Sequence, residues 1–219
     1  MSISACSKST SWKEEVLLHD GSKIIVDRSV EYGGRHELGQ SPPFKEQTLT
    51  FTMPKTKQRI TWKDDYSDDV GSANFNPLLL EVFRGDTAYV IASPVNIQSI
   101  SKWDCPDPPY VIFSYHGNAW IRIPIDKLPG EVKTPNLMLS SPDEVARKFN
   151  FGLIPASTIK EENEELTQPE FRVIERTHSA QGKVGCLVRN KGGGWGSPGG
   201  AKAPGGPFTP HINDVNSKN

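Results

Sequence analysis

This sequence lacks several features that identify common functional classes of protein. It contains no run of about 18 apolar residues, so no segment is predicted to cross a membrane as a helix. Neither sign of charge is in excess, because 25 Lys and Arg residues stand against 26 Asp and Glu residues. That balance gives no reason to expect binding to nucleic acid. The GxSxG, HExxH and P-loop motifs are also missing, so no local motif predicts a catalytic or nucleotide site.

Cysteine is scarce, and the three that occur are Cys6, Cys105 and Cys186. Their spacing excludes the CxxC pairs of zinc and redox sites. If Cys6 is modified, Cys105 and Cys186 remain as a candidate disulfide, which is typical of an oxidising compartment. We expect no cofactor and no bound metal.

Glycine and proline are concentrated at the end of the chain, where residues 190–219 hold eight Gly and four Pro. The large apolar residues there are Trp195, Phe208 and Ile212. So few apolar side chains cannot offset the entropy lost on ordering the segment. The sequence therefore predicts a disordered tail, and the alternative is a segment that docks on a partner through Trp195 or Phe208.

The body of the chain is predicted to consist of antiparallel β-hairpins. Asp20-Gly21 stands between two apolar runs, a strong hairpin pattern. Three more hairpins are expected, with strands at 48–53 and 58–62, at 78–83 and 87–92, and at 110–115 and 119–123. The predicted fold is mainly β, in the form of a sandwich, a meander or a partial barrel.

Helices are expected only late in the chain, as one or two short segments near 142–166. Ser141 followed by Pro142 is typical of a helix start. A second helix is expected from Ser157 to a point before Pro169, followed by a strand pair at 170–176 and 183–188. The predicted organisation is a tether at 1–11, one β-rich domain at 12–189 and the tail at 190–219.

The N-terminal residues match the lipobox of bacterial lipoproteins. Ile3, Ser4 and Ala5 supply the aliphatic and small residues before Cys6, whose thiol would take the diacylglycerol. The basic and apolar regions of a signal peptide are missing before them, so we expect the true start to lie upstream of Met1. The alternative is a cytosolic protein in which Cys6 has no special role.

Several segments together carry a family resemblance. They are WKEEVLLHDG at 12–21, YGGRHELGQ at 32–40, KEQ at 45–47, KW at 102–103, PPYV at 108–111 and WIRIP at 120–124. Over residues 8–176 the chain resembles a group of uncharacterised lipoproteins of Gram-negative bacteria. The resemblance implies a location in the cell envelope and brings no established activity.

Arg35, His36 and Glu37 form the first candidate site, in a glycine-rich loop between two predicted strands. A His beside a Glu can act as an acid/base pair or provide metal ligands. However, neighbouring residues of an extended chain point in opposite directions, and no second His stands at ligand spacing. The favoured interpretation is a structured loop held by salt bridges of Arg35 and Glu37.

Two further clusters of residues are candidate binding sites. The four carboxylates of Asp64, Asp65, Asp68 and Asp69 do not follow the EF-hand spacing, so a solvated turn is expected rather than a Ca²⁺ site. Aromatic residues on neighbouring hairpins are a candidate groove for a sugar or peptide, although aromatics on strands usually pack a core. These residues are Trp62, Trp103, Tyr110 and Trp120.

Three functional hypotheses follow, and the first is a lipid-anchored, periplasm-facing module that binds or supports a protein or glycan of the cell envelope. Ser7 after Cys6 favours the outer membrane, and the lipid anchor would be the only membrane contact. The second hypothesis is a small hydrolase-like envelope enzyme that uses Arg35, His36 and Glu37. The third is a cytosolic binding protein of the immunity type. The sequence leans against an enzyme and leaves the oligomeric state open.

Overall fold

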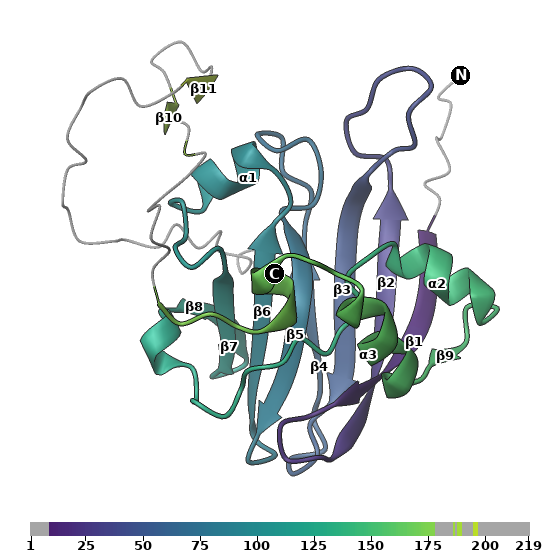
Figure 1. Cartoon of the computed structure of the whole chain (residues 1–219), viewed down its shortest axis with the longest axis vertical. Coiled ribbons are helices and arrows are strands. Elements are labelled where there is room, and N and C mark those ends of the chain that lie inside the picture. The colour runs from purple at the N-terminus through teal and green to yellow at the C-terminus, as the bar shows by residue number, and fades with distance from the viewer. Residues whose placement is uncertain (1–8, 178–185, 187, 190–194, 197–219) are drawn as a thin grey trace, which may run out of the picture.

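Two β-sheets packed face to face make up the body of the protein (Figure 1). The computed structural model describes residues 9–177, 186, 188–189 and 195–196. The first sheet has the order β4-β3-β2-β1-β9 and the second the order β5-β6-β7-β8. The prediction of a mainly β fold with a few short helices is confirmed, and the sandwich is the form that occurs.

The strands of the first sheet are β1 (Ser9–Leu17), β2 (Lys23–Tyr32), β3 (Phe44–Thr52), β4 (Arg59–Asp64) and β9 (Leu153–Ile154). Those of the second sheet are β5 (Phe75–Phe83), β6 (Thr87–Pro94), β7 (Val111–His116) and β8 (Ala119–Ile123). A separate two-stranded sheet pairs β10 (Val188–Arg189) with β11 (Trp195–Gly196). The helices are α1 (Ile97–Lys102), the 3-10 turn η1 (Ile125–Lys127), α2 (Pro142–Lys148), α3 (Ala156–Glu164) and α4 (Pro169–Arg172).

All four expected hairpins are present as antiparallel pairs. The first turns at Asp20-Gly21, where Gly21 has a φ of 83°, a left-handed conformation that glycine adopts without steric cost. Because β2 also pairs with β3 and β6 with β7, each half of the sandwich is a meander of four successive strands. Among the described strands of these two sheets, β9 alone lies outside the meanders, and it pairs in parallel with β1.

The main core lies between the two sheets. In β1 the alternation of side chains buries Trp12, Glu14 and Val16, whereas Lys13 and Leu17 face solvent. Opposite them, β5 and β6 are buried on both faces. Their outer face is covered by residues 125–139 and 169–176, which we call the C-terminal strap and which bury Leu128, Val132 and Ile174 against them. The helices α2 and α3 cover the inner face of the first sheet beside β1 (Figure 1).

Single side chains join the two sheets at both edges of the sandwich. At one edge the Trp120 indole N–H of β8 donates to the carbonyl of Thr61 in β4, at 2.7 Å. At the other edge the amide of Asn136 donates to the carbonyls of Leu17 in β1 and Leu80 in β5, both at 2.9 Å. The Asn136 oxygen also accepts from the backbone N–H of Leu80, at 2.9 Å. Asn136 therefore satisfies backbone groups on two strands that do not pair with each other.

The structure corrects one expected element near the end of the domain. The strand predicted at 170–176 is wrong, because Pro169 instead begins the short helix α4, a position where its missing N–H costs nothing. Helix α1 was not expected from the sequence. Cys6, residues 183–185 and 187 of the expected strand at 183–188, and all of 190–219 except β11 lie outside the described residues. Of that expected strand, Val188 is the first residue of β10, which pairs with β11 and not with 170–176. Within the described part of the chain, no helix is long and apolar enough to span a membrane.

Candidate functional site

A groove of about 690 Å³ opens between the end of the β1–β2 hairpin, the C-terminal strap and helices α3 and α4. Apolar side chains line much of it, among them Leu17, Leu79, Pro135, Ile159 and Phe171. Its volume lies within the usual range of small-molecule sites, which combine an apolar lining with a few placed polar groups. These properties make the groove the strongest candidate for a binding site in the described residues.

His19 and Glu81 form the polar centre of this groove. His19 Nδ1 lies 2.8 Å from Glu81 Oε1, and the backbone N–H of His19 donates to Glu81 Oε2 at 3.0 Å. The Glu81 side chain is 2% exposed, whereas that of His19 is 19% exposed. The His19 ring also stacks on Phe83, with ring centroids 5.0 Å apart. A buried carboxylate thus fixes the orientation of a histidine that reaches the groove, an arrangement used for proton transfer and for hydrogen bonding to ligands.

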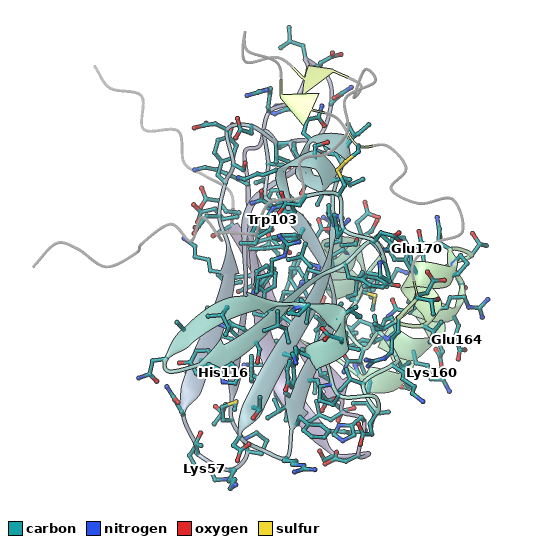
Figure 2. All side chains as sticks on the ribbon, turned by 90° about the vertical axis from the view of Figure 1, so that its left-hand side faces the viewer. Lys57, Trp103, His116, Lys160, Glu164 and Glu170 are labelled. Carbon is teal, nitrogen blue, oxygen red and sulfur yellow. A yellow bond between two sulfur atoms is a disulfide. The ribbon has the colours of Figure 1, made fainter. Side chains whose placement is uncertain are left out.

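Charged side chains surround the groove, and the cationic ones outnumber the acidic ones. The cations are Lys23, Lys133, Lys160 and Arg172, and the acids are Glu81, Glu131 and Glu164. Two of the three acids already have partners, since Glu81 contacts His19 and Glu164 pairs with Lys160 at 3.7 Å. Lys160 and Glu164 lie on the same side of the molecule as Glu170 of α4 (Figure 2).

The Arg35, His36 and Glu37 loop lies far from this groove. Lys23, at the start of β2, lines the groove, whereas the loop follows the other end of that strand. All three side chains are exposed, and none lines the groove. Arg35 donates to the backbone carbonyl of Asp68 at 3.0 Å, where the sequence suggested a salt bridge. The structure therefore brings no acid/base pair together here.

Close packing of glycines holds the base of this loop. A Cβ at Gly34 would lie 2.6 Å from a ring carbon of Pro43 and 2.8 Å from the carbonyl oxygen of Gly71. Any side chain at this position would therefore force the two loops apart. His36 Nδ1 lies 2.7 Å from the Gly34 carbonyl, which ties the histidine back to its own loop.

The four aromatic residues of the proposed groove serve different packing roles. Trp62 is buried in the core between the sheets. Trp103 packs at the edge of the same core, with its ring centroid 4.7 Å from that of Phe75. Tyr110 is buried beneath the strap and donates to the carbonyl of Glu170 at 2.9 Å. With Trp120 joining the two sheets, the four residues lie at different places in the packing of the described residues.

The acidic cluster is divided by burial. Asp64 is buried, and its carboxylate accepts hydrogen bonds from the backbone N–H groups of Asn74 and Phe75 at 2.8–3.0 Å. Burial raises the pKa of the Asp64 carboxyl, and these hydrogen bonds act in the opposite direction. Asp65 and Asp68 remain exposed. Within the described residues, no group of three or more His, Cys, Asp or Glu side chains is placed to hold a metal ion.

A disulfide joins Cys105 and Cys186, with Cα atoms 5.8 Å apart. Cys105 follows α1, and Cys186 lies beyond the strap in the sequence, so the bond closes a loop of 81 residues. That loop includes β7, β8 and helices α2 to α4. The bond thus ties the chain beyond the strap to the segment between α1 and β7 (Figure 2).

A buried ion pair that the sequence did not reveal lies under α2 and α3. Arg28 Nη1 donates to Glu14 Oε1 at 3.0 Å and to the carbonyl of Met138 at 2.8 Å. The Trp12 indole N–H also donates to Glu14 Oε1, and the Met138 N–H donates to Glu14 Oε2. These hydrogen bonds link β1, β2 and the segment at Met138, so the pair stabilises the packing there.

No family model, curated protein or solved structure matches this chain. The geometry of the groove and the disulfide are therefore the observations on which a functional proposal rests.

Proposed function

We propose that this protein is a lipid-anchored, periplasm-facing binding module of the bacterial cell envelope, and that the groove beside His19 is its ligand site. The observation that carries the proposal is the groove itself. It combines an apolar lining with an oriented histidine and a charged rim, which is the composition of a small-ligand site.

Two further observations support the location. The Cys105–Cys186 disulfide fits an oxidising compartment such as the periplasm. The lipobox cysteine stands three residues before Ser9, where β1 begins, so a lipid on Cys6 would lie within about 10 Å of the sheet. The protein would then project directly from the membrane surface.

The location is tested by the intact mass of the protein, purified from its own host with its native upstream DNA. The proposal expects a chain that begins at Cys6, carries acyl mass and has no free thiol after denaturation. A chain with three free thiols and no acyl group would overturn it and favour a cytosolic binding protein of the immunity type.

The ligand site is tested with Nile red, a neutral apolar dye whose emission rises on binding to an apolar site. We expect saturable binding that the Ser157→Trp substitution blocks, because Ser157 is exposed and lines the groove. Ser140 is also exposed but does not line the groove, so Ser140→Trp is the matched control. Equal binding by both variants would place the dye elsewhere and refute the site.

A second candidate function, a hydrolase-like enzyme, draws its support from the His19–Glu81 pair instead of the Arg35 loop. A carboxylate that orients a histidine is a common acid/base arrangement. In the described residues Glu81 is the only side chain that hydrogen-bonds to the His19 ring, so a water molecule would have to be the nucleophile. Ester hydrolysis that His19→Gln abolishes while Nile red binding persists would favour this function.

A further inference from the structure

We propose that the groove binds a carboxylate with a chain-like apolar body, a ligand of the fatty-acid class. This inference rests on the proposed function, because it names the ligand of that same site. The apolar lining would take the chain, and the cations at the rim would take the carboxylate.

The position of two cations supports a carboxylate head group. The backbone N–H of Ile174 donates to the carbonyl of Lys133 at 2.7 Å, which holds the segments that carry Lys133 and Arg172 side by side. Both side chains are exposed and line the groove. Neither takes part in an ion pair within the described part of the chain. An anionic group at this point of the rim would meet two cations without displacing a carboxylate of the protein.

The charge of the rim differs from that of the whole molecule. The groove is lined by four cationic and three acidic side chains, whereas the whole chain has a net charge of -1. Lys23 pairs with Glu15 and Lys160 pairs with Glu164, so these two cations are already compensated. Lys133 and Arg172 remain to meet an incoming anion, and the exposed Glu131 opposes it. The pair of cations at this point of the rim favours an anion over a cation of the same shape.

The apolar lining supports a chain-like body. Leu17 and Leu79 come from the two strand edges that Asn136 bridges, and Phe171 comes from α4 in the strap. A groove built from strand edges on one side and a strap on the other suits an extended chain. About 690 Å³ is suited to a small ligand rather than to a protein surface.

The experiment is displacement of Nile red from the full chain by three probes with the same twelve-carbon tail: dodecanoate, dodecanol and dodecyltrimethylammonium, each below its micellar concentration. We expect dodecanoate to displace the dye at the lowest concentration and the cationic probe at the highest. In the Lys133→Gln/Arg172→Gln variant, dodecanoate is expected to bind roughly tenfold more weakly. Two charge contacts near the surface together contribute about 1.4 kcal/mol, which corresponds to that factor in affinity. Nile red and dodecanol binding should not change.

Lys127→Gln is the matched control, because Lys127 is an exposed lysine of the strap that does not line the groove. It should leave all three affinities unchanged. Equal displacement by dodecanoate and dodecanol, or no effect of the double substitution, would overturn the carboxylate inference while the groove remained a binding site. Failure of Nile red to bind the groove would instead overturn the proposed site itself.

Discussion

Substitution of Glu14 by Gln is expected to cost about 3 kcal/mol of unfolding free energy, although the side chain changes by one atom. The Glu14 carboxylate is fully buried and accepts from Arg28, Trp12 and Met138 at 2.8–3.1 Å. A glutamine retains one acceptor oxygen, so one of the present donors would face an NH₂ group. Arg28, whose side chain is 3% exposed, would also keep its charge without a counter-charge. Loss of one partner from a buried ion pair typically costs about 3–5 kcal/mol, and the retained acceptor favours the lower end.

The assay is urea unfolding followed by tryptophan fluorescence, in which 3 kcal/mol corresponds to a midpoint shift of about 1.5 M for a typical slope of about 2 kcal/mol/M. Glu15→Gln is the control. Glu15 is the next residue of the same strand, but it lies on the solvent side, where it pairs with the exposed Lys23 at 2.9 Å. A much smaller shift is expected for it. Equal losses in the two variants would refute the reasoning that burial makes the Glu14 charge expensive to remove.

Three further predictions concern the disulfide, one surface carboxylate and the strap. The Cys105→Ser/Cys186→Ser variant should lose about 4–5 kcal/mol in non-reducing urea unfolding, because the bond closes a loop of 81 residues; a loss under 1 kcal/mol would contradict the loop-entropy estimate. A hydrogen bond from Lys13 lowers the pKa of Asp27, so its stabilising effect is present above about pH 4 and is lost as the pH falls below it. Between about pH 5 and pH 3 the unfolding free energy of Asp27→Asn should therefore fall less than that of the parent protein. Identical profiles of unfolding free energy against pH would disprove this. Tyr110→Phe removes the hydroxyl that holds the strap and should cost about 1 kcal/mol, with faster amide exchange in α4; unchanged exchange there would argue against that role.

The strands were predictable because their signals are local. Asp20-Gly21 and Gly117-Asn118 place residues with positive φ between apolar runs, and the structure has φ values of 83° at Gly21, 54° at Gly117 and 67° at Asn118. Such turns fix where neighbouring strands start and end. Helix α1 also has a local signal in the sequence, which is an Asn at the N-cap position. The Asn96 side chain accepts a hydrogen bond from the Ser99 N–H, at 2.9 Å.

The groove was not predictable by the same means, because its parts come from distant positions. His19 and Glu81 are 62 residues apart, and neither belongs to a recognised catalytic or ligand-binding motif. One signal was available: Glu81 is the only charged residue in the apolar run 78–83. A lone acid in a strand buried on both faces needs a partner, although the sequence does not say which residue supplies it. The Arg35 loop was a candidate only because its residue types, His and Glu, can act as acid/base groups or metal ligands.

The continuity of the chain within each sheet has a consequence for the order of folding. Residues 9–64 and 75–123 each build four strands that pair in chain order, and tight turns close two hairpins in each set, so these hairpins can form rapidly from local contacts. Strand β9 must instead find Lys13 from position 153, after every other strand of both sheets has been made. Segment 125–176, which carries β9, α3 and α4, is therefore expected to dock last. Since α3 and α4 form one wall of the groove, a chain stopped before that step would have both four-stranded meanders but would lack that wall.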